Sequence, residues 1–173
     1  MMRPLLTRKT LALLAVAASL ALGASAPPPA LPITDLKDLT IVEKQPYDES
    51  ANADAVVAAA FDRAKKSHKR VLLDLGGNWC PDCIILANVM RIPAMQKFMT
   101  DHYEFASVDV GRFDKNLQIP ARFGYTTRLT GVPTVLVATP DGKLVNDGHV
   151  FALSDARHMT PQSLAEYLAE WTE

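Results

Sequence analysis

Two cysteines stand three positions apart, as Cys80 and Cys83, and they are the only cysteines of the chain. The two thiols of such a C-x-x-C motif can form a disulfide with each other or stand reduced side by side. When the first cysteine begins a helix, unpaired backbone N–H groups and the helix dipole stabilise its thiolate, which is the nucleophile of disulfide exchange. The spacing therefore indicates a redox-active pair, with Cys80 as the attacking thiol and Cys83 as the resolving thiol.

Two other roles for the pair fit the sequence less well. A structural disulfide across so short a loop contributes only about 2 kcal/mol in the loop-entropy model, and disulfide-stapled secreted domains carry more cysteines. A zinc site needs about four ligands, and no ligand spacing is shown by the histidines, which are His68, His102, His149 and His158. We therefore expect neither a metal ion nor another cofactor.

The hydrophobic pattern around the motif predicts the elements that position it. Residues 70–75 form a nearly continuous apolar run, typical of a strand that is covered on both faces of a sheet, and Pro81 suits the first turn of a helix. We expect strands at 39–43, 70–75, 104–110, 134–138 and 143–150, and helices at 53–66, 81–90, 93–102, 116–123 and 161–171. Strands separated by helices, followed by a hairpin and a closing helix, predict an α/β fold with a central mixed sheet flanked by helices.

The stretch 71–83, which ends in Trp79-Cys80-Pro81-Asp82-Cys83, resembles the strand, tryptophan and redox motif of the thioredoxin family. The loop 131–134, which reads Gly-Val-Pro-Thr, resembles the cis-proline loop of that family. The resemblance spans about residues 53–171. It implies a thioredoxin-like fold and the activity of a thiol–disulfide oxidoreductase.

The resemblance also implies roles for residues around the cysteines. Asp74 matches the buried acid of the family, and burial should raise its pKa so that it can exchange a proton with the resolving thiol. The backbone of Val132, in front of Pro133, would pair with an extended substrate, and Trp79 would line the rim of the site. The alternative for Asp74 is a structural acid that is hydrogen-bonded in the core.

The sequence departs from the family at two places that matter for the site. The lysine that usually partners the buried acid, on the next strand, is replaced by Phe105, which puts the assisted proton transfer in doubt. The segment 111–130 is longer than its counterpart in a minimal thioredoxin. It is either a docking rim beside the active site or a solvated loop, and we favour the loop.

The two residues between the cysteines, Pro81 and Asp82, are expected to tune the redox potential. A negative charge at Asp82 opposes the Cys80 thiolate and so destabilises the reduced form. Histidine, which is typical of strongly oxidising relatives, does not occur there. We therefore expect an enzyme that reduces or exchanges client disulfides. The alternatives are an oxidising, disulfide-forming protein and a binding or assembly module that holds an extended client with little redox turnover.

The first 26 residues have the order of a secretory signal peptide, with basic residues, an apolar run and then small residues. We expect cleavage between positions 23 and 26, a proline-rich spacer at 27–38 and a thioredoxin-like domain at 39–173. This organisation predicts a periplasmic protein, which contacts the membrane only if the signal stays uncleaved. Its partners would be client proteins and a membrane-bound or soluble thiol as electron donor. The net charge of −1 gives no indication of nucleic-acid binding.

Overall fold

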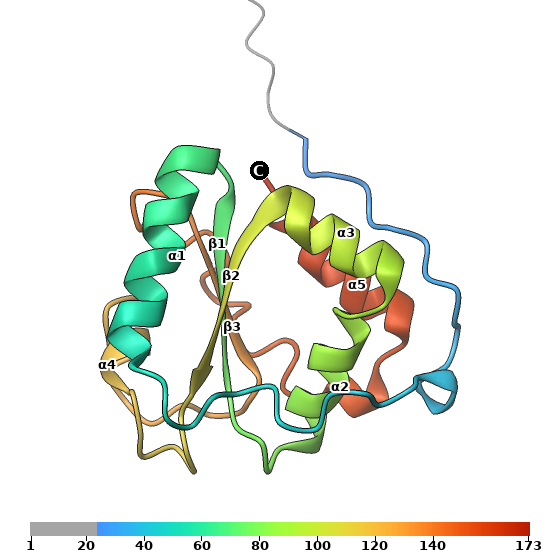
Figure 1. Ribbon diagram of the computed structural model, residues 1–173, viewed down its shortest axis with the longest axis horizontal. Coiled ribbons are helices and arrows are strands. Elements are labelled where there is room, and N and C mark those ends of the chain that lie inside the picture. The colour runs from blue at the N-terminus through green and yellow to red at the C-terminus, as the bar shows by residue number, and fades with distance from the viewer. Residues whose placement is uncertain (1–23) are drawn as a thin grey trace, which may run out of the picture.

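Three strands form the centre of the computed structural model, which describes residues 24–173 (Figure 1). The middle strand β1 (Arg70–Gly76) runs parallel to β2 (Tyr103–Asp109) and antiparallel to β3 (Thr134–Ala138). Strand β3 is buried along its whole length and β1 along all but its first residue. This burial on both faces explains why the two sequences are apolar without alternation.

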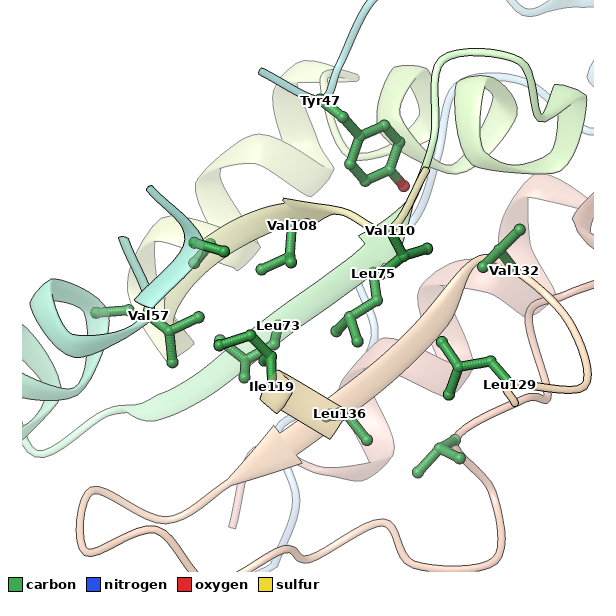
Figure 2. Packing of buried hydrophobic residues seen from close by; sticks show 14 of the residues in the cluster. Tyr47, Val57, Leu73, Leu75, Val108, Val110, Ile119, Leu129, Val132 and Leu136 are labelled. Atoms are coloured by element: carbon green, nitrogen blue, oxygen red, sulfur yellow. The ribbon is translucent and has the colours of Figure 1, made fainter. Parts of the chain in front are cut away.

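Helices cover both faces of the sheet (Figure 1). On one side lie α1 (Ala53–Ser67) and the short α4 (Gln118–Ala121), and on the other α2 (Pro81–Val89), α3 (Pro93–His102) and α5 (Pro161–Glu170). Two short 3-10 turns complete the elements, η1 (Leu36–Asp38) and η2 (Ala156–His158). Leu73 and Leu75 of β1 belong to the same buried cluster as Val57 of α1 (Figure 2), whereas Leu72 belongs to the cluster beneath α2, α3 and α5. The α/β fold that the sequence predicts is confirmed.

Short polar side chains and prolines set the helix ends where the sequence indicates them. Asn52 accepts a hydrogen bond from a backbone N–H in the first turn of α1, and Thr160 forms a capping box with Ser163 at the start of α5. Pro93 begins α3 after a short break, so the expected division into two helical pieces is confirmed. The helix expected at 116–123 is shorter and consists of α4 alone.

The strand expected at residues 39–43 is wrong. The backbone N–H groups of Val42 and Glu43 both donate to Oδ1 of Asn88, each at 2.9 Å, and Nδ2 of Asn88 donates to the Glu43 carbonyl at 2.7 Å. An amide side chain of α2 therefore supplies the hydrogen bonds that a neighbouring strand would have supplied.

The strand expected at residues 143–150 is also wrong. Leu144 forms an isolated bridge with Ala138 at the end of β3, and the carbonyl of Val150 accepts from the N–H of Val135 at 2.9 Å. Further along, the buried side chain of Asn146 accepts from the N–H of Val137 at 2.9 Å and donates to the carbonyl of Val135 at 2.8 Å. Because this side chain replaces backbone partners of β3, the pairing is interrupted in the middle of the segment, and the described residues form three strands instead of five.

The last residues of the expected signal peptide and the proline-rich spacer after them lie against the domain; in the spacer, the N–H of Leu31 donates to Gln162 Oε1 at 3.2 Å. Ser25 Oγ donates to the Glu170 carbonyl at 2.6 Å, and the N–H of Ala26 donates to Thr172 Oγ1 at 2.7 Å. Apolar residues of the spacer pack on the hydrophobic cluster beside α5. Most of the expected signal peptide, residues 1–23, lies outside the described residues. Among the residues that are described, no helix combines the length and the apolar character needed to cross a membrane.

Candidate active site

Cys80 and Cys83 lie where the chain passes from the end of β1 into α2. Cys80 occupies the N-cap of this helix, Pro81 takes its first position, and the N–H of Cys83 donates to Cys80 Sγ at 3.2 Å. Both cysteines are free thiols and both are buried. The structure therefore brings the pair to the helix start that the sequence indicates.

The two thiols differ in acidity. Hydrogen bonds from Cys83, first from its thiol and then from its backbone N–H, lower the pKa of Cys80 below that of an ordinary cysteine. Burial raises the pKa of Cys83, and the hydrogen bond to Cys80 and the negative charge of Asp74 raise it further. A thiolate thus forms first at Cys80 while Cys83 keeps its proton, which is the order that attack followed by resolution requires.

The loop in front of β3 lies against Cys80. Its peptide bond between Val132 and Pro133 is cis, as the resemblance implies. The Sγ atom of Cys80 donates to the carbonyl oxygen of Val132 at 3.4 Å, so this stretch of backbone borders the sulfur. An extended chain that paired with Val132 would run directly past Cys80.

Asp74 lies in the sheet close to the cysteines, between Ser107 and Val135, and is only 1% exposed. Burial raises its pKa to about 7, although a hydrogen bond from Tyr47 acts in the opposite direction. Its charge acts on Cys83, whose pKa it raises. In the described part of the chain its Oδ1 atom has no hydrogen-bond partner, which argues against a purely structural acid. The arrangement suits proton exchange near neutral pH.

The partner of Asp74 comes from an unexpected element. Phe105, at the position expected for the lysine of the family, lies opposite Leu72 in the sheet and is 38% exposed. The hydroxyl of Tyr47 instead donates to Oδ2 of Asp74 at 2.9 Å. Tyr47 precedes α1 in an irregular segment, 27 residues before the acid, and no local pattern in the sequence links it with the site.

Asp82 is bound by an arginine and does not stand free beside Cys80. Its carboxylate is 2% exposed, and the Nε atom of Arg157, in η2, lies 3.0 Å and 3.1 Å from its two oxygens. The Nη2 atom of Arg157 also donates to Oδ2, and the backbone N–H donates to Oδ1 at 2.8 Å. Asp82 raises the pKa of Cys80, as predicted, but the hydrogen bonds from Cys83 outweigh it. The argument for a reducing centre from a lone negative charge therefore loses its main support.

Trp79 lines the rim of the site together with the segment 111–130. Its Nε1 donates to a backbone carbonyl of this segment at 2.7 Å, and the guanidinium carbon of Arg112 lies 4.9 Å from the centre of its ring. Phe113 meets the ring edge-on at 5.8 Å, and Arg128 lies 4.7 Å from the centre of the Phe113 ring. This packing holds Arg112 and Phe113 of the segment beside the tryptophan of the motif.

The donor set of the site is two thiols, one buried acid and one ion-paired acid. Within residues 24–173, no three His, Cys, Asp or Glu side chains gather as metal ligands would. Disulfide exchange itself requires only a thiolate, a second thiol and a proton acceptor, and the side chains just described supply these three groups.

Several known proteins are similar to this chain. The structure of a disulphide isomerase from Xylella fastidiosa Temecula1 is 36% identical in sequence, with a TM-score of 0.70, and the match covers 75% of this chain and 98% of that chain. A DsbH oxidoreductase matches at 22% identity and a TM-score of 0.40, over 50% of this chain and 65% of that chain. No curated protein sequence matches the chain. The model of a family described as thioredoxin-like matches residues 52–140, a range that contains both the C-x-x-C motif and the cis-proline loop, and the chain belongs to this thioredoxin-like family.

Proposed function

We propose that the protein is a periplasmic thiol–disulfide oxidoreductase that reduces or exchanges the disulfides of client proteins. The observation that carries the proposal is the asymmetric thiol pair, in which an acidified Cys80 begins a helix and a buried Cys83 keeps its proton. A relative that is 36% identical is described as a disulphide isomerase, which supports this chemistry. The order of a signal peptide in the first 26 residues supports the periplasmic location.

In the reductive direction, the Cys80 thiolate attacks one sulfur of a client disulfide. The client S–S bond breaks, a bond between Cys80 and the client forms, and the other client sulfur leaves as a thiolate that takes a proton from solvent. Cys83 then gives up its proton, with Asp74 as the final acceptor, and attacks the sulfur of Cys80. The second client thiolate leaves, and two electrons have passed from the cysteine pair to the client.

A thiol donor must then reduce the disulfide between Cys80 and Cys83 by the same two steps. We propose a membrane-bound or soluble thiol protein as this donor, because an oxidising compartment would otherwise keep the pair oxidised. Run in reverse, the same steps oxidise client thiols. The direction of electron flow therefore depends on the potential of the pair relative to that of its partners.

The surface around Cys80 suits a client in extended conformation. The backbone of Val132 borders the sulfur, and the exposed part of the Trp79 ring lies at the rim. Main-chain pairing with Val132 would hold a client strand with little preference for its sequence, and the tryptophan would add apolar contact. Such a surface would accept unfolded or loop segments that carry a disulfide.

Insulin reduction with dithiothreitol and measurement of the reduction potential test the proposal. We expect the wild type to accelerate insulin reduction, Cys80→Ser to be inactive, and Cys83→Ser to accumulate mixed disulfides that non-reducing electrophoresis and mass spectrometry locate at Cys80. A double variant without both cysteines is the matched control and should trap nothing. A wild type that never cycles between dithiol and disulfide would refute the proposal and leave a binding module. A pair that oxidises clients and cannot reduce them would refute the reductive direction.

A further inference from the structure

Tyr47 reaches the active site from outside the motif. It is 2% exposed, and both of its backbone groups are held by Asn78 in the turn before the cysteines. The N–H of Tyr47 donates to Asn78 Oδ1 at 3.0 Å, and its carbonyl accepts from Nδ2 at 2.9 Å. The ring points its hydroxyl toward the end of β1 (Figure 2), where it donates to Oδ2 of Asp74. The tyrosine is thus fixed both to the turn that carries the cysteines and to the buried acid.

The same hydroxyl lies beside the resolving thiol. A Cβ atom added to Gly76 would lie 2.4 Å from Tyr47 Oη and 2.7 Å from Cys83 Sγ, so both atoms border one point at which only a glycine fits. Burial raises the pKa of Tyr47, and the negative charges of Asp74 and Cys83 raise it further, which fits a neutral phenol between the two groups. A hydroxyl in this position can accept a proton from the thiol while it donates its own proton to the acid.

We propose that Tyr47 relays the proton of Cys83 to Asp74 while Cys83 resolves the mixed disulfide. The inference rests on the proposed function, since it concerns the second step of that reaction. It supplies the proton path that the family lysine would have assisted and that Phe105 does not provide. It also gives a reason for the hydrogen bond between a buried phenol and a buried carboxylate.

In the relay, the S–H bond of Cys83 breaks and its proton joins the oxygen of Tyr47, while the O–H bond of Tyr47 breaks and its proton joins Oδ2 of Asp74. The Cys83 thiolate attacks the sulfur of Cys80, the disulfide of the pair forms, and the client thiolate leaves. Asp74, with a pKa of about 7, then returns the proton to solvent. It lines a pocket of about 370 Å³ beside β2, α2 and α3.

The reaction of the reduced full-length protein with excess dithiobis(nitrobenzoate) in a stopped-flow instrument separates the two steps. Attack by Cys80 releases the first nitrothiobenzoate at a rate that grows with reagent concentration, and resolution by Cys83 releases the second at a rate that does not. Tyr47→Phe removes only the hydroxyl and keeps the ring and the backbone hydrogen bonds. Tyr103→Phe is the matched control, because Tyr103 is also buried and its hydroxyl donates to the Leu168 carbonyl.

We expect Tyr47→Phe to slow resolution about 10- to 100-fold at neutral pH, because a positioned proton-transfer group contributes about 100- to 10,000-fold and Asp74 retains part of the effect. The attack by Cys80 should change less than about twofold. The pH profile of resolution should move to higher pH, because the variant lacks the hydrogen bond that lowers the pKa of Asp74. Tyr103→Phe should leave both steps unchanged.

Two results would overturn the relay. One is a Tyr47→Phe variant that resolves at the wild-type rate with the wild-type pH profile. The other is equal slowing of both steps, which would indicate that the hydroxyl only supports the fold. Failure of the proposed function has a different signature, because the wild type itself would then release no second nitrothiobenzoate.

Discussion

The buried carboxylate of Asp74 should make the stability of the reduced protein depend on pH, and Asp74→Asn should remove that dependence. The pKa of this group is 3.8 without perturbation and about 7 in the fold, because burial disfavours the charged form. The folded state therefore holds the proton at pH values at which the unfolded chain has released it. Stability contributed by the protonated acid is fully present below about pH 4, declines as the pH rises, and is gone above about pH 7.

The size of the effect follows from the two pKa values of Asp74. A difference of about 3 pKa units, at about 1.4 kcal/mol per unit, corresponds to about 4 kcal/mol of unfolding free energy. Asparagine cannot titrate, so the variant does not lose this unfolding free energy as the pH rises. It does bring amide N–H donors into a buried place, which costs about 1–3 kcal/mol at every pH. The quantity to measure is therefore how the difference in unfolding free energy between the variant and the wild type changes with pH, and not that difference at a single pH.

Urea unfolding of the wild type and Asp74→Asn from about pH 4 to about pH 8 measures this change. We expect the unfolding free energy of Asp74→Asn, relative to that of the wild type, to increase by about 4 kcal/mol from the lowest to the highest pH. Asp82→Asn is the matched control, because it also removes a buried carboxylate, but one that is bound by Arg157. It should lower the stability and keep the pH dependence that Asp74 causes. Parallel curves for the wild type and Asp74→Asn would refute the reasoning.

Two further substitutions test the surroundings of the pair. Arg157→Leu leaves the charge of Asp82 without its partner, so the pKa of Cys80 should rise and the reduction potential should fall by about 30 mV, which corresponds to a tenfold change in the redox equilibrium constant. Thiolate absorbance measures the pKa of Cys80, and equilibration with glutathione measures the reduction potential. An unchanged or higher potential would contradict this prediction. The control Arg122→Leu frees only an exposed carboxylate and should change neither quantity. Asn146→Ala leaves backbone groups of β3 without partners and should cost about 2–3 kcal/mol of unfolding free energy in urea at an unchanged potential. A variant as stable as the wild type would show that the chain after β3 can re-pair with the sheet edge.

The local part of the site can be predicted from the sequence. Asp74, Cys80 and Pro81 lie in one stretch in which a buried strand turns into a helix, and the order of these elements determines where each side chain lies. Residues 131–134 lie far from this stretch in the sequence, and only the likeness to a known family links the two. The cis bond before Pro133 agrees with that likeness.

Side chains that act across long separations cannot be predicted in this way. Tyr47 lies in an irregular segment and Arg157 in the short 3-10 turn η2, neither of which shows a periodicity, and they reach their acids over 27 and 75 residues. The two wrong strands have a related cause. Asn88 and Asn146 replace a backbone ladder with amide side chains, and the apolar pattern of a segment does not reveal whether its backbone pairs with a strand or with an amide.

The two carboxylates that flank the cysteines have partners of different kinds, and this difference suits them to different tasks. A lysine beside Asp74 would favour its charged form strongly, whereas the neutral hydroxyl of Tyr47 favours it weakly, so the acid keeps a pKa of about 7. An acid with that pKa is about half protonated at neutral pH and can both take and return a proton. Asp82 has a guanidinium partner, and its charge is balanced so that Cys80 remains acidified beside it. The neutral partner therefore belongs to the acid that exchanges protons with Cys83, and the charged partner belongs to the acid that stands next to the nucleophile.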